Sequence, residues 1–133
     1  MTQTGLDEAM IQELLEADVA FIDAVQKALG DFHASAPAGW QQWESWRKPD
    51  PWKDKVLPHL QKYREWSEEA LREWKKGNPA PAVEAATGQM GLSKKIDFDL
   101  DWATPENRQA LEAALDRVAA AADRIWRLAR PQP

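Results

Sequence analysis

Tryptophan and basic side chains are interleaved in one stretch of this sequence, where together they could bind another macromolecule. Six of the eight tryptophans fall between Trp40 and Trp74. Trp and Arg carry much of the binding energy at protein interfaces, whereas the same rings packed together would form the core of a small helical domain. The sequence leaves both interpretations open. The candidate partner-binding residues are Trp40, Trp43, Trp46, Arg47, Lys48 and Trp52.

Rings interleaved with cations also suit single-stranded nucleic acid, because bases stack on the rings and cations hold the phosphates. The basic residues of this alternative site are Lys53, Lys55, Lys62 and Arg64, with a second row at Arg117, Arg124, Arg127 and Arg130. The net charge of −5, the isoelectric point near 5.1 and the lack of a nucleic-acid-binding sequence signature argue against it. Acidic residues dominate positions 1–46 and basic residues positions 47–76. We expect either that an acidic helix lies beside a basic one, or that the two faces meet different partners.

Asp97, Asp99 and Asp101 alternate along the chain, as do the first ligands of a calcium-binding EF-hand loop. The rest of that pattern is missing, because Trp102 stands at the position of the turn glycine and Arg108 at that of the bidentate glutamate. We therefore predict no metal site. The aspartates are expected to form a solvated acidic face that protects a strand edge from unwanted pairing, with a protein-binding strand as the alternative.

Asp18 interrupts the apolar seam of the first predicted helix. A buried carboxylate is costly unless it is paired. We therefore expect Asp18 either at the edge of the seam or bonded to an Arg side chain or a Trp N–H of another helix. A site carboxylate and a polar residue that sets the helix register are the alternatives.

No arrangement of residues in the sequence is typical of catalysis. The only histidines are His33 and His59, cysteine is absent, and no serine lies in a nucleophile-elbow context. No glycine-rich loop of the phosphate-binding type is present. We therefore predict that the protein is not an enzyme and uses no cofactor.

Apolar side chains recur at intervals of three and four residues, which predicts helices. The predicted helices span residues 5–33, 38–48, 51–76 and 105–130. The last two begin at pairs of an N-cap residue and a proline, Asp50-Pro51 and Thr104-Pro105. Pro58 has no N–H group, so it should kink or split its helix near the start.

Two further segments complete the predicted fold. Residues 77–95 are rich in Pro, Gly and Ala and are expected to form a mobile connection. Residues 96–102 alternate strictly between apolar and acidic side chains, which predicts an extended segment whose apolar side packs on the helices. The predicted fold class is all-α. It is a compact three- to four-helix bundle in one domain, residues 1–133, with one extended or β-like segment.

These features predict a non-enzymatic protein that binds another protein or protein complex, as a small helical adaptor, inhibitor or accessory subunit. A helical subunit of a nucleoprotein complex is the alternative. A bundle that binds a small molecule, with Asp18 and tryptophans lining a pocket, is the third interpretation. No apolar run is long enough to span a membrane, and the absence of cysteine fits a reducing cytoplasm. Neither the partner nor the oligomeric state is specified by the sequence.

Overall fold

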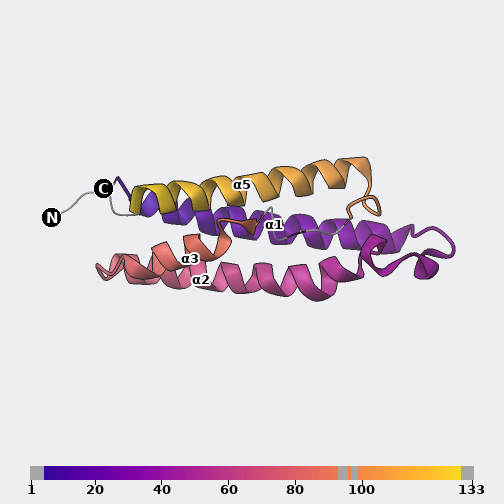
Figure 1. Cartoon of the computed structure of the whole chain (residues 1–133), viewed down its shortest axis with the longest axis horizontal. Coiled ribbons are helices and arrows are strands. Elements are labelled where there is room, and N and C mark those ends of the chain that lie inside the picture. Colours follow the sequence, from indigo (N-terminus) through magenta and orange to yellow (C-terminus); the bar gives the residue numbers. More distant parts are fainter. Residues whose placement is uncertain (1–4, 93–95, 97–98, 130–133) are drawn as a thin grey trace.

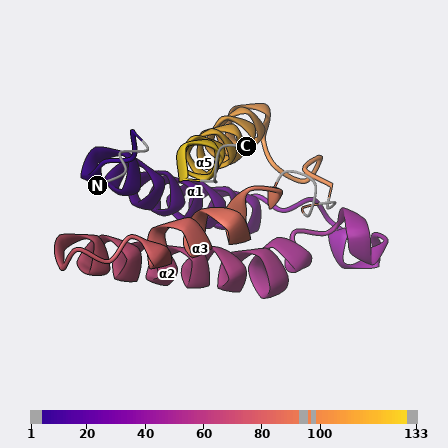
Figure 2. The ribbon, with the colours of Figure 1, turned by 60° about the vertical axis from the view of Figure 1, so that its left-hand side comes forward.

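The protein folds into a bundle of aligned α-helices. The computed structural model describes residues 5–92, 96 and 99–129. The long helices α1 (Glu8–Ala34), α2 (Leu57–Lys75) and α5 (Pro105–Ala129) follow the long axis, and the shorter α3 (Ala80–Gln89) covers part of α2 (Figure 1). α1 packs on α2 and α5, and α3 also contacts both, which closes a ring among the described helices (Figure 2). The all-α prediction is confirmed, and 79% of the described residues are helical.

The apolar seam of α1 forms the centre of the core. Ile11, Phe21 and Val25 of this seam are completely buried, as are Leu60 of α2 and Val118 of α5. Burial of each such side chain stabilises the fold by roughly 1.5–3 kcal/mol. The seam therefore holds the three long helices together. Within the described residues, no helix is both long and apolar enough to cross a membrane.

Side-chain caps determine where two of the helices begin. Oδ1 of Asp7 accepts a hydrogen bond from the N–H of Met10 at 3.0 Å, so α1 begins at Glu8 rather than at residue 5. Oγ1 of Thr104 accepts one from the N–H of Asn107 at 3.2 Å. Each cap satisfies a backbone donor that the first turn leaves without a partner. The predicted start of α5 is confirmed.

The predicted helix 51–76 stays helical across Pro58, but its hydrogen-bonding pattern changes just before this residue, which has no N–H to donate. One π-helical turn, Trp52–Val56, precedes α2 and takes up the disruption. The predicted N-cap at Asp50 does not form, because Asp50 already lies in the first helical turn. The carbonyl of Pro49 accepts the first N–H groups of this turn instead.

The prediction of a helix over residues 38–48 is wrong. Two short 3₁₀ helices stand there, η1 (Trp40–Gln42) and η2 (Ser45–Arg47), separated by extended backbone. An isolated helix of this length is marginal in water. Tertiary packing determines the conformation of this segment instead, because the rings of Trp40 and Trp43 pack against the core.

The prediction of a mobile connection over residues 77–95 is wrong in its central part, where α3 forms. Pro79 and Pro81 lie at the N-cap and in the first turn of α3, where a missing N–H costs no helical hydrogen bond. Alanine has the highest helix propensity of all residues. The alanines that α3 buries against the bundle are Ala82, Ala85 and Ala86.

No strand forms among the described residues between Ile96 and Trp102. Ile96 and Leu100 are half-buried and pack on the core, and Trp102 is buried. Ile96, Leu100 and Trp102 therefore face the bundle, as the sequence predicts, but they do so without forming a strand. Asp97 and Phe98 lie outside the described residues.

The same substitution at two glycines should have opposite effects on stability. Gly77 follows α2 with a φ of 89°, a left-handed conformation that strains any side chain, so Gly77→Ala should destabilise the fold by about 1 kcal/mol. Gly30 lies inside α1, and open space surrounds the position of a Cβ. Gly30→Ala should therefore stabilise the fold by about 0.5–1 kcal/mol. Urea unfolding measures both changes, and shifts of the same sign would contradict this account.

Candidate functional site

The aromatic cluster at one end of the bundle is built around Phe32 of α1. Its ring makes edge-to-face contacts with Trp40, Trp43 and Trp102, at centroid separations of 5.2, 6.0 and 5.9 Å. Trp102 in turn contacts Trp52 at 6.4 Å. Such pairs contribute about 0.5–1.5 kcal/mol each beyond their burial. Most tryptophans of the predicted binding stretch are thus part of the core at this end.

The predicted partner-binding tryptophans differ in their exposure. Trp52 is 1% exposed and donates its indole N–H to the carbonyl of Asp99 at 3.3 Å, so its side chain is not accessible to a partner in this structure. Trp40 and Trp43 are half-buried. The side chain of Trp46 is 53% exposed and is the one member of this set that projects into solvent.

η2 presents an indole and a guanidinium next to each other. The indole N–H of Trp46 donates to the carboxylate of Glu44, and the carbonyl of Trp46 accepts the N–H of Asp99 at 3.4 Å. The guanidinium of Arg47 lies 5.8 Å from the centroid of the Trp43 ring, at cation–π distance. Lys48 follows and is half-buried. Backbone and ring contacts therefore hold both exposed side chains on a packed support.

The basic residues of α2 and the preceding turn divide into two groups. Three predicted phosphate-binding lysines are exposed. Among the described residues, no carboxylate forms an ion pair with them. They are Lys53, Lys55 and Lys62. The ammonium of Lys62 lies 5.9 Å from the ring centroid of Trp66. Arg64, by contrast, is half-buried and lies 3.7 Å from the carboxylate of Glu68.

The predicted basic row on α5 is largely engaged within the molecule. Arg117 donates two hydrogen bonds of 2.8 Å to the carboxylate of Glu13 on α1, which lowers the pKa of Glu13. Arg127 pairs with a carboxylate one turn earlier on α5, at 2.6 Å. Arg124 is exposed, and Arg130 lies outside the described residues. The acidic α1 does lie beside the basic α2, as expected, but the ion pairs that α1 makes with another helix, among the described residues, go to Arg117 of α5.

The two described aspartates of the predicted acidic face both have partners within the molecule, Asp99 in its own turn and Asp101 on α5. Oδ1 of Asp99 accepts the backbone N–H of Asp101 at 2.8 Å. The carboxylate of Asp101 pairs with Arg108 at 3.1 Å. In the part of the chain that the structure describes, no three His, Cys, Asp or Glu side chains are grouped as metal ligands.

A buried polar network joins α1, α2 and α3. Asp18 of α1, Ser67 of α2 and Gln89 of α3 all have no exposed surface. The hydroxyl of Ser67 donates to Oδ2 of Asp18 at 2.6 Å. The sequence predicts Asp18 at the edge of the seam, or bonded to an Arg or a Trp. Both predictions are wrong, because Asp18 is fully buried and bonds to neither residue type among the described residues. Its partners are a hydroxyl and an amide.

The carboxamide of Gln89 fits this network in two orientations. In one, its nitrogen donates to Oγ of Ser67 at 3.3 Å; in the other, it donates to Oδ1 and Oδ2 of Asp18 at 2.5 and 3.3 Å. The first suits a protonated Asp18, whose O–H can donate to the amide oxygen, and the second suits a carboxylate, which only accepts. Burial raises the pKa of Asp18 to about 7, against the opposing effect of the two hydrogen bonds. Asp18 therefore changes charge near neutral pH.

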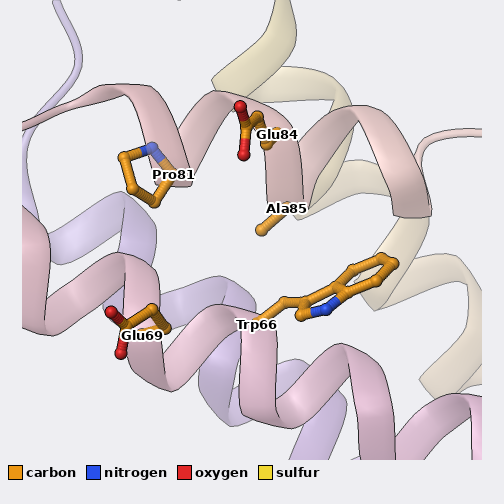
Figure 3. Close-up of a pocket in the computed structure, with 5 residues that line it drawn as sticks. All are labelled: Trp66, Glu69, Pro81, Glu84 and Ala85. Atoms are coloured by element: carbon orange, nitrogen blue, oxygen red, sulfur yellow. The ribbon is translucent and has the colours of Figure 1, made fainter.

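Two grooves adjoin α2. The first lies between α2 and α3, has a volume of about 350 Å³, and is lined by Trp66, Glu69, Pro81, Glu84 and Ala85 (Figure 3). The second has a volume of about 380 Å³ and is lined by Lys55, Val56, His59, Leu60, Tyr63, Leu92 and Ile96.

A row of aromatic rings on α2 links the two grooves. The His59 ring stacks on Tyr63 at 6.3 Å, and Tyr63 contacts Trp66 at 5.5 Å. The spacing of these residues, four and then three, is the one sequence feature that could have indicated the row. The wall that α3 forms in the first groove could not be predicted, because the sequence analysis did not predict α3.

Comparisons with protein-family models, with curated proteins and with solved structures find no match for this chain. Its function is therefore inferred from the surfaces described above. These are the exposed indole and guanidinium of η2, the lysines along α2, and the groove between α2 and α3 with its two carboxylates.

The raised pKa of Asp18 makes stability depend on pH. Between the ordinary carboxyl value of 3.8 and the native value of about 7, the folded protein keeps a proton that the unfolded chain releases. The free energy of unfolding should therefore fall as pH rises through this window, and level off above about pH 7. For Asp18 alone the fall is roughly 4 kcal/mol. Asp18→Asn cannot ionise, so it should remove most of this slope and be more stable than the parent protein above about pH 7.

Urea unfolding from about pH 5 to about pH 8 measures this slope. Asp23→Asn is the matched control, because Asp23 is an exposed carboxylate on the same helix and its replacement should leave the slope unchanged. A slope that is equally steep in Asp18→Asn would show that another group causes it.

Proposed function

We propose that this protein is a non-enzymatic binding protein, a small helical adaptor, inhibitor or accessory subunit that docks on another protein through η2. The single observation that carries this proposal is the 53% exposure of Trp46, with Arg47 beside it on the same short helix. Trp and Arg are the residue types enriched among interface hot spots. Trp40 and Trp43 support this surface from the core, and Lys48 belongs to its rim.

The support beneath η2 favours binding as well. The ring packing of Trp43 on Phe32 and the backbone hydrogen bond from Asp99 to Trp46 hold the segment in one conformation. A surface that is already ordered loses less conformational entropy when a partner docks. The cysteine-free composition makes the cytoplasm the compartment that we propose for this interaction.

A subunit of a nucleoprotein complex is the second candidate. Lys53, Lys55 and Lys62 favour it, since they are exposed and meet no carboxylate among the described residues. The ion pairs of Arg117 and Arg127 weigh against it, because those arginines would have to exchange an intramolecular partner for a phosphate. The third interpretation, a small-molecule pocket containing Asp18, has less support, since Asp18 lines neither of the two grooves.

Replacing Trp46 should weaken binding without affecting the fold. With a partner that is recovered in stoichiometric amounts from native cells and then purified, Trp46→Ala should weaken binding by about 30-fold, which corresponds to roughly 2 kcal/mol. Its melting temperature should match that of the parent protein, because the indole is largely in solvent. Isothermal titration calorimetry and thermal melts provide the two measurements.

Two further variants make this test specific. Val19→Ala removes an exposed apolar side chain on α1 and should leave binding unchanged. Trp52→Ala empties a core position and should cost about 3–5 kcal/mol of stability. If the double variant Trp46→Ala, Arg47→Ala binds as tightly as the parent, η2 is not the interface.

The nucleic-acid alternative predicts strong salt dependence, since each phosphate contact releases counterions. We expect no saturable binding when labelled single-stranded DNA or RNA is titrated by fluorescence anisotropy at low salt. Tight binding that collapses with salt, and that Lys55→Gln with Lys62→Gln weakens, would replace our proposal by the alternative. Lys27→Gln is the control for charge, because Lys27 pairs with Asp31 on α1 at 2.7 Å.

A further inference from the structure

The groove between α2 and α3 combines an aromatic wall with carboxylates from both helices. Trp66 and Glu69 come from α2, and Pro81, Glu84 and Ala85 come from α3 (Figure 3). α3, which forms one wall of the groove, lies towards the end of the bundle opposite the segment of residues 40–47 (Figure 1). The groove is therefore a surface separate from the one that contains Trp46.

Gly88 of α3 leaves space for the indole of Trp66 to lie against the helix backbone. A Cβ at Gly88 would lie 2.9 Å from Cζ3 of the Trp66 ring, so only glycine allows the ring this close to α3. Glycine inside a helix costs about 1 kcal/mol relative to alanine. Trp66 is still 41% exposed, so the ring packs against α3 and also lines the groove.

Cations of the protein already lie beside the groove. The Lys62 ammonium is 5.9 Å from the ring centroid of Trp66, and Nε of Arg72 donates to the carboxylate of Glu69 at 3.1 Å. Glu84 is exposed and forms no ion pair among the described residues. The ring and one carboxylate therefore each attract a cation in this structure, and a second carboxylate faces them from α3.

The chemistry of the lining determines which ligand can bind. The two glutamates accept hydrogen bonds and carry negative charge, while Pro81 and Ala85 are apolar. Among the described residues of the lining, the indole N–H of Trp66 is the only side-chain donor. A neutral sugar needs both donors and acceptors, whereas a cation with a hydrocarbon chain needs an aromatic face, carboxylates and apolar contacts.

We propose that this groove is a binding site for the ammonium end of an alkylamine. The ammonium lies over the indole of Trp66, within reach of Glu69 and Glu84. The methylene chain packs on Pro81 and Ala85. A lysine side chain of another protein and a free polyamine share this chemistry.

NMR of the indole N–H groups tests the proposal on the intact protein at low salt. Butylamine is the probe, and butanol is its uncharged match. We expect butylamine to shift the Trp66 signal in a saturable manner, while butanol does not and the Trp46 signal stays in place. Trp66→Phe assigns the signal. Comparing putrescine with N-acetyl-lysine N-methylamide then distinguishes the two sources of the amine by their relative affinity.

Substitutions around the groove should change the affinity for butylamine in opposite directions. Glu84→Gln and Glu69→Gln should each weaken it by roughly two- to fivefold, the range for exposed charge pairs. Lys62→Gln and Arg72→Gln should strengthen it, because each removes a competing cation. Glu112→Gln makes the same charge change on α5, outside the groove, and should have no effect.

Three results would each overturn the proposal. The first is the absence of a saturable Trp66 shift at millimolar butylamine. The second is an equal response to butanol, which would indicate a merely apolar groove. The third is an affinity that the Glu84→Gln and Arg72→Gln variants leave unchanged.

Discussion

The buried carboxylate of Asp18 constrains the arrangement of three helices at once. It has no exposed surface, and an unpaired carboxylate there would cost several kcal/mol. Ser67 of α2 and Gln89 of α3 supply its hydrogen-bonding partners. A shift of either helix by one turn would separate these groups, although apolar contacts tolerate many alternative packings. Only a register that keeps these three side chains together gives the buried carboxylate its partners.

The same register determines the surface of the groove between α2 and α3. Trp66 directly precedes Ser67, and Gly88 directly precedes Gln89. Adjacent residues of a helix point in directions about 100° apart. While Ser67 and Gln89 meet Asp18 inside, the preceding residues meet at the surface, where the indole lies on the helix backbone. The packing of α2 on α3 therefore places both the buried polar network and the Trp66 wall of the groove.

At the opposite end of the bundle, some aromatic side chains are buried in the core and one is exposed to solvent. Trp52 and Trp102 are buried, whereas Trp46 is 53% exposed. Asp99 connects the two groups, because its carbonyl accepts the indole N–H of Trp52 and its own N–H donates to Trp46. The backbone at Asp99 therefore supports η2. Stability at this end depends on the buried rings, so the exposed indole is free to serve a different role.

The sequence by itself determined the elements whose causes are local. The cap at Thr104, the irregularity near Pro58 and the apolar seam of α1 could all be predicted, because caps, prolines and side-chain periodicity act within a few residues. The tryptophan-rich stretch was also evident from the sequence, but the exposure of each ring was not. Only the tertiary structure decided that α3 forms, that η1 and η2 replace a helix, and that Asp18 meets Ser67. These outcomes depend on contacts between residues far apart in the chain, and local spacing does not encode which distant side chains will meet.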